Sequence, residues 1–81
     1  MIYKLSMTTR PVFQIKQFLV DNFGDPDKEL AFLANYGVHY QRQSLYKQWR
    51  RESIPADLLP LLLALLEIEN GAPVSLVKWL K

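Results

Sequence analysis

Glycine and proline divide the sequence into short segments, and this division restricts the chain to an assembly of short elements. The sequence has three glycines, and each follows a stretch with apolar residues at helical spacing, where glycine commonly ends a helix. Pro26 and Pro55 mark further boundaries, because proline is tolerated in the first turn of a helix and disrupts its interior. The 81 residues have the length of one small domain. We therefore expect a single all-α domain over residues 1–81, built from about five short helices.

The first two predicted helices are apolar on one side. In the first, which Thr9 can cap, the inner side consists of Val12, Ile15, Leu19 and Phe23. In the second, which starts at Asp25-Pro26, it consists of Leu30, Leu33 and Ala34. Asp27 and Glu29 stand in the first turn of that second helix, where the helix dipole favours anions. Helix termini therefore account for these acidic residues without a catalytic role.

Leucine dominates the later part of the chain. A third helix is expected from Gln41 to Glu52, and a fourth, capped by Asp57, over the sequence LLPLLLALLEIEN. Because the fourth helix is apolar on nearly all sides, it must be buried in the domain or shared with a partner. A last helix is expected after Pro73, in the segment 72–81. Residues 1–9 are expected to form an arm or a short strand.

The last predicted helix is a candidate for self-association. Few surfaces of so small a domain remain to cover its apolar side chains. We therefore expect a homodimer contact formed by Val74, Val77, Trp79 and Leu80. The alternative is that these residues close the core of the monomer.

The charged residues are distributed in blocks, although the net charge is only +2. Residues 30–51 contain four basic and no acidic side chains, for a net charge of +4. Residues 21–29 before them carry a net charge of −3, and residues 52–69 after them carry −4. A basic segment between acidic ones suits a small protein that presents one face to a polyanion. The alternative is an ordinary solvated helix face.

The outward side of the third predicted helix is polar and cationic. At 100° per residue, Leu45 and Trp49 share the inner side. The opposite side carries Gln43, Lys47 and Arg50, flanked by Ser44 and Arg51. Glutamine can make paired hydrogen bonds to adenine, and lysine or arginine can donate to the acceptors of guanine. We expect Gln43, Ser44 and Lys47 to read bases in the major groove, and Arg50 and Arg51 to contact phosphates.

The motifs around this helix resemble a known family. A helix ends at Gly37-Val38, the stretch QSLYKQW and a basic pair follow, and an Ile54-Pro55-Ala56 turn leads into a leucine-rich helix that ends at Asn70-Gly71. This order resembles the phage Cro and repressor type of helix-turn-helix regulator over roughly residues 27–71. The resemblance implies a lambda-repressor-like domain with its helix-turn-helix at residues 27–52. It also implies sequence-specific operator binding, usually as a dimer, in the control of prophage or mobile-element genes.

Two positions depart from the family pattern. Tyr46 stands about three residues further beyond Gly37 than the family places it, so either the turn is longer or the recognition helix begins early. Leu33 occupies a position where the family has a small alanine, a role that Ala31 or Ala34 could take by a shift in register.

Several residues outside the outward row are further candidates for contacts with DNA. These are His39, Tyr40, Gln41 and Arg42 in or next to the turn, and Lys28 at the start of the second helix. For each of them the alternative is ordinary solvated surface. Two functions follow from the sequence: a sequence-specific regulator that binds double-stranded DNA, or a small protein-binding inhibitor or adaptor that uses the helix-turn-helix shape without DNA.

The composition argues against other classes. Cysteine is absent and His39 is the one histidine, so thiolate or multi-histidine metal sites and a Ser–His–Asp set have no support. No apolar run approaches the ~20 residues that span a bilayer, and no secretion signal is recognisable. We therefore expect a cytoplasmic protein that is not an enzyme and has no cofactor, no metal, no small-molecule ligand and no membrane partner.

Overall fold

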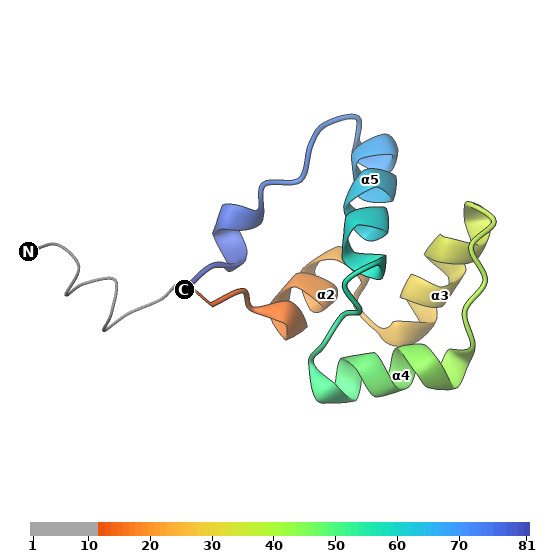
Figure 1. The fold of residues 1–81 in the computed structure, drawn as a ribbon. Helices are drawn as coiled ribbons and strands as arrows, with labels where there is room; N and C mark the ends of the chain where they lie inside the picture. Colours follow the sequence, from red (N-terminus) through yellow and green to blue (C-terminus); the bar gives the residue numbers. More distant parts are fainter. Residues whose placement is uncertain (1–11) are drawn as a thin grey trace, which may run out of the picture.

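The structure, a computed structural model, describes residues 12–81, and within that range it is all-α and contains no strand (Figure 1). The α-helices are α2 (Ile15–Phe23), α3 (Pro26–Asn35), α4 (Arg42–Arg51) and α5 (Leu58–Asn70). A single 3₁₀ turn, η1 (Leu76–Trp79), follows them. The predicted all-α class is confirmed for this range. The predicted arm and the Thr9 cap lie outside the described residues.

The two ends of α3 are set by residues that the sequence singled out, whereas the start of α5 is not. Asp25 precedes α3, and its Oδ1 accepts the backbone N–H of Lys28 at 2.8 Å. Gly37 follows α3 with a φ of 79°, a left-handed conformation that glycine adopts at little cost, and its N–H donates to the Ala34 carbonyl at 2.9 Å. Asp57 occupies the predicted cap position of α5, but its side chain makes no capping hydrogen bond.

The two ends of the described chain pair with each other, and this corrects two predictions. Val12 is not in a helix: its N–H donates to the Lys81 carbonyl at 2.8 Å, and its carbonyl accepts the Lys81 N–H at 3.1 Å. Phe13 and Leu80 form an isolated antiparallel bridge beside this pair. Because residues 12–14 are extended by this pairing, α2 begins at Ile15. The predicted last helix is likewise reduced to the short turn η1.

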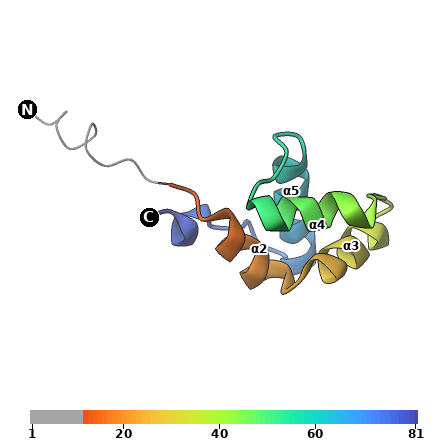
Figure 2. The same ribbon diagram turned by 90° about the horizontal axis from the view of Figure 1, so that it is seen from below.

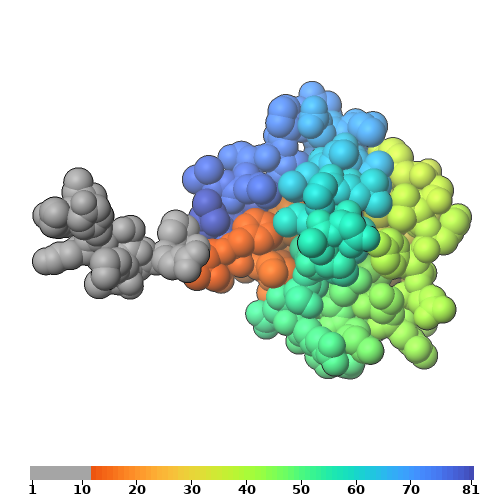
Figure 3. Space-filling view, viewed as in Figure 1, coloured from red at the N-terminus to blue at the C-terminus, as the bar shows by residue number. Residues whose placement is uncertain are grey.

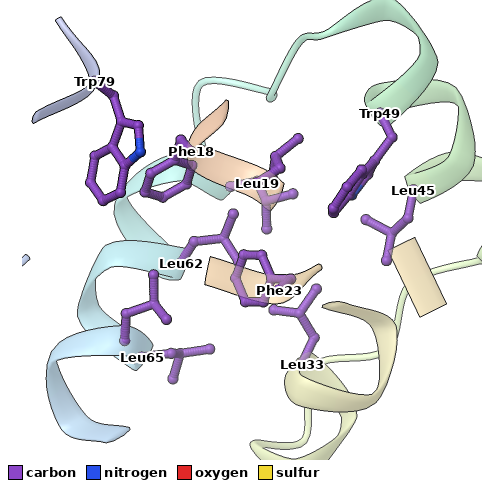
Figure 4. Packing of buried hydrophobic residues seen from close by; sticks show 11 residues of the cluster. Phe18, Leu19, Phe23, Leu33, Leu45, Trp49, Leu62, Leu65 and Trp79 are labelled. Atoms are coloured by element: carbon purple, nitrogen blue, oxygen red, sulfur yellow. The ribbon is translucent and has the colours of Figure 1, made fainter. Parts of the chain in front are cut away.

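The core consists of eleven buried apolar side chains contributed by every helix and by η1 (Figure 4). Leu58, Leu62, Leu65 and Leu66 of α5 belong to it, so the leucine-rich helix is buried along one side. Its opposite side is not: Ile68 is 66% exposed. Of the two predicted alternatives, burial in the domain therefore applies to the inner side of α5, and a contact with a partner remains a prediction for its outer side.

Trp79 also belongs to the core. It is 4% exposed, and its ring lies edge-on to Phe18 with the centroids 5.0 Å apart. The predicted dimer contact by Trp79 is therefore corrected, since this side chain closes the core of the monomer and offers almost no surface to a second copy. Of the other three residues, Val77 and Leu80 are exposed and Val74 is half-buried.

The inner side of α3 also differs from the prediction. Leu33 is fully buried, but Ala34 is exposed, and so is Ala31. Neither alanine takes the proposed close-packing role, because Leu33 itself lies in the core. Residues 36–41 connect α3 to α4, which starts at Arg42. Helix α4 thus starts one residue later than the predicted Gln41.

Helix α4 lies at one side of the helical domain. It runs along the lower edge in Figure 1, and the view from below in Figure 2 shows it in front of the other helices. In the space-filling view its atoms form the lower surface of the domain (Figure 3). The arrangement leaves one long side of α4 accessible. No described helix has the length and apolar character needed to cross a membrane.

Candidate nucleic-acid interface

Helix α4 turns its basic residues outward, as its sequence predicts. Leu45 and Trp49 lie in the core on the inner side. The side chains of the outward row, which we define as Gln43, Lys47 and Arg50, are all exposed. Arg51 is exposed and Ser44 is half-buried beside the row. The predicted orientation of this helix is confirmed.

Within the described part of the chain, the basic side chains Lys47, Arg50 and Arg51 form no ion pair. The single ion pair among residues 12–81 joins Arg42 to Asp27, with Nε and Oδ1 2.9 Å apart. Lys47, Arg50 and Arg51 have no such partner there, and α4 contains no acidic residue. Three unpaired cations on one accessible side give that side a positive potential that attracts anions.

Two open hollows flank Lys47. One is lined by Arg42, Gln43, Tyr46, Lys47 and Arg50. The other, between the end of α4 and the loop before α5, is lined by Ser44, Lys47, Gln48, Arg51 and residues 53–55. Lys47 borders both hollows. Each hollow is lined by further polar side chains and by at least one arginine.

No protein-family model, curated protein or solved structure matches the chain. The indication of function therefore comes from the side chains of α4 and from the residues of α3 that contact them.

Arg42 is engaged within the chain. Its Nε and Nη2 donate to the two carboxylate oxygens of Asp27 at 2.9 and 3.2 Å, and its guanidinium lies 5.2 Å from the centre of the Tyr46 ring. The Tyr46 hydroxyl also donates to Asp27, at 2.8 Å. The hydrogen bonds from Tyr46 and then Arg42 lower the pKa of Asp27. Arg42, which the sequence gives as a candidate for contacts with DNA, is therefore paired with a carboxylate of its own chain.

Glu29 lies in the core beneath α4, not at a solvated helix terminus. It is 0% exposed, and its Oε1 accepts the indole N–H of Trp49 at 2.7 Å. Its Oε2 is buried and has no hydrogen-bond partner. Burial raises the pKa of Glu29, and the hydrogen bond from Trp49 opposes that rise in part. The favourable position at a helix N-terminus, which the sequence suggests as the reason for Glu29, does not explain why this carboxyl is buried.

One signal in the sequence could have revealed the burial of Glu29. It precedes Leu33 by four residues, so both residues share one side of α3. Trp49 stands four residues after Leu45, so the sequence places both on the inner side of α4. An acid and an indole donor on two facing inner sides are a plausible pair, but their separation of 20 residues leaves the pairing to the tertiary structure.

Relative to the wild type, Glu29→Gln is expected to gain stability as pH rises, because the amide oxygen can still accept from Trp49 and the buried titrating group is removed. The wild-type carboxyl has a raised pKa in the folded state, so its favourable contribution is complete below the unfolded pKa of about 4.5 and is lost as pH rises through the folded pKa. The advantage of the variant should therefore appear as pH increases above about 4.5.

Urea unfolding of both proteins across this pH range measures the difference directly. Asp21 and Asp27 have lowered pKa values, so their contributions change at lower pH and cancel between the two proteins. A difference in unfolding free energy that is constant with pH would contradict a buried, titrating Glu29.

The remaining predicted contacts are not brought together with the outward row. His39 and Gln41 are exposed in the turn, and Lys28 is exposed in the first turn of α3. Tyr40 is half-buried and packs against the core, so part of its ring is occupied. None of these four residues lines the two hollows beside Lys47. They remain predictions, and the row with Ser44 and Arg51 is the coherent part of the candidate interface.

The described residues contain no group of three or more histidine, cysteine, aspartate or glutamate side chains arranged to hold a metal ion.

Proposed function

We propose that the chain is a sequence-specific regulator of transcription that binds double-stranded DNA, of the phage or mobile-element type. In this proposal residues 27–52 form a lambda-repressor-like helix-turn-helix, and α4 is the recognition helix. The observation that carries the proposal is the outward row of Gln43, Lys47 and Arg50, exposed on a helix without acidic residues. The major groove of B-DNA is wide enough for one α-helix.

The proposed roles follow from the chemistry of each side chain. Gln43 carries a donor and an acceptor and suits adenine, and Lys47 suits the acceptors of guanine. Ser44, at the rim of the second hollow, suits a single hydrogen bond to a base or a phosphate. Arg50 and Arg51, in the last turn of α4, are assigned to phosphates. The base-reading residues thus precede the anchoring ones along the helix.

The proposal includes a homodimer. Val77 and Leu80 are exposed, and Val74 is half-buried, next to the paired chain ends. These three residues remain candidates for the contact between copies, now without Trp79. Dimers of this class bind two half-sites about one helical turn of DNA apart, roughly 34–36 Å.

Selection of bound duplexes from a random pool tests the proposal. We expect one enriched motif, and a two-fold symmetric motif would support the dimer. The matched control is the variant Lys47→Ala/Arg50→Ala/Arg51→Ala, which keeps the buried side of α4 and should enrich no motif. Failure of the wild-type protein to retain any duplex at low ionic strength would refute DNA binding, because the nonspecific electrostatic contribution is largest there.

Asp27→Asn is expected to strengthen nonspecific binding to duplexes. The substitution removes the anion that neutralises Arg42, so Arg42 becomes available to phosphate and the salt dependence should steepen by about one unit of slope. Affinity titrations at several salt concentrations measure the slope. Asp25→Asn is the matched control: it removes the same charge two residues away, keeps a capping side chain and has no contact with Arg42. Equal slopes for both variants would contradict the specific role of Asp27.

The second candidate function, a protein-binding inhibitor or adaptor, would use a different surface. The outer side of α5 has an open hollow lined by Ala64, Glu67, Ile68 and Gly71, and Ile68 is largely exposed there. Single exposed apolar side chains are common on protein surfaces, so this hollow is the place at which a protein partner can be tested. Ile68→Asp should leave DNA selection unchanged if the regulator proposal holds. A chain that selects no duplex but loses a protein partner through this substitution would support the second candidate instead.

A further inference from the structure

Helix α3 holds α4 at two polar points that differ in their surroundings. At the surface, Asp27 binds Arg42 and Tyr46. In the core, Glu29 binds the indole N–H of Trp49. Both acids belong to the first turn of α3, and their partners Tyr46 and Trp49 are about 4.5 Å apart along the axis of α4. Two separated attachments restrain the rotation of a helix about its own axis, which one attachment does not.

The core attachment is not explained by stability. An ionised carboxylate inside a protein loses its hydration, and Glu29 recovers one hydrogen bond while Oε2 recovers none. No charged side chain compensates it, since burial and the bond from Trp49 are the influences on its pKa. Replacement of a complete buried ion pair by apolar residues is often neutral or stabilising, so burial of an ionisable group is weak evidence that the group stabilises the fold. A role that depends on the direction of the bond accounts better for an acid at this position.

The direction of this bond bears on the outward row. The apolar contacts of Leu33 and Leu45 in the core attract without a preferred direction, whereas a hydrogen bond weakens steeply when its angle departs from linearity. Trp49 lies two residues after Lys47 and one before Arg50. Turning α4 by about 20° would move side-chain atoms 5–6 Å from its axis by about 2 Å. Base recognition does not tolerate a displacement of that size.

We propose that Glu29 is a positioning residue: by accepting the indole N–H of Trp49, it sets the rotation of α4 and thereby the direction in which Gln43, Lys47 and Arg50 point. The consequence for DNA rests on the proposed function, but the rotation itself does not. Glu29 touches no solvent and is placed to act only through Trp49.

Three variants separate the hydrogen bond from the charge. Glu29→Gln keeps an acceptor and removes the charge, Glu29→Leu removes the acceptor, and Trp49→Phe removes the donor from the other side. Trp79→Phe is the matched control. Its indole N–H also donates to a carboxylate, that of Asp21 at 2.8 Å, but this bond joins η1 to α2 and does not involve α4.

Residual dipolar couplings of the backbone amides give the orientation of α4 relative to α3 without any DNA. We expect Glu29→Leu and Trp49→Phe to turn α4 by more than about 10°, and Glu29→Gln and Trp79→Phe to leave it in place. With a selected duplex, the first two variants should lose about tenfold or more in discrimination against a mismatched site, and they should keep their nonspecific affinity at low salt. Glu29→Gln should restore the discrimination.

An unchanged orientation of α4 in both Glu29→Leu and Trp49→Phe would overturn the proposal. Failure of both variants to fold would also overturn it, because the bond would then be required for folding rather than for positioning. Turning of α4 in these variants, in a protein that selects no duplex, would support the positioning role and refute the proposed function. The two conclusions are therefore distinguishable.

Discussion

Leu45→Ala is expected to destabilise the protein by about 2–5 kcal/mol. Leu45 is 0% exposed and lies in the same cluster as Leu33 of α3 and Phe18 of α2. Removal of its side chain leaves a cavity at the centre of the helical domain, which the surrounding helices can only partly fill. A domain of this length has a total stability of roughly 4–12 kcal/mol, so much of it would be lost.

Thermal and urea unfolding measure this loss. For a domain of this size each kcal/mol corresponds to a shift in Tm of about 4–8 °C. Gln43→Ala is the matched control, because Gln43 is exposed on the same helix and alanine favours the helix. Its unfolding free energy should stay within about 0.5 kcal/mol of the wild-type value. A small effect of Leu45→Ala, similar to that of Gln43→Ala, would show that the inner side of α4 is not packed as described.

Lys47→Ala is expected to weaken binding to the selected duplex by about 1–3 kcal/mol and to relax the preference at one base position. Lys47 borders both hollows on the outward side of α4, so its loss removes a donor that no neighbour replaces at the same place. Its side chain is exposed, and the fold should not change. Repeating the duplex selection with this variant, together with affinity titration, identifies the position whose preference is lost.

Arg51→Ala provides the contrast, because Arg51 is assigned to phosphate. It should weaken binding to every duplex by a similar factor and reduce the salt dependence by about one unit of slope, without a change in the selected motif. Loss of Lys47 should therefore change the selected motif, whereas loss of Arg51 should change the affinity for all duplexes and leave the motif as it is. If Lys47→Ala reduced all affinities uniformly, or Arg51→Ala altered the motif, the division of roles along α4 would be wrong.

Short-range information in the sequence was sufficient for the existence of the four α-helices and for the ends of α3. Glycine with positive φ and a capping aspartate act within a few residues, so the ends of α3 could be predicted from Asp25 and Gly37. The spacing of Leu45 and Trp49 likewise determined which side of α4 faces inward, and hence that Lys47 is exposed. The outward half of the candidate interface was therefore predictable, because helical periodicity places its residues without reference to the rest of the chain.

The tertiary structure alone decided which residues meet across the chain. The bond from Trp79 to Asp21 spans 58 positions, that from Trp49 to Glu29 spans 20, and that from Arg42 to Asp27 spans 15. No local pattern encodes such pairings, because they depend on how the helices pack once the apolar sides are buried. The packing of α3 against α4 buries Glu29 as an acceptor for Trp49 and pairs Arg42 with Asp27. It also paired residues 12–14 with the chain end, where hydrogen bonds between distant segments outweighed the local preference for helix.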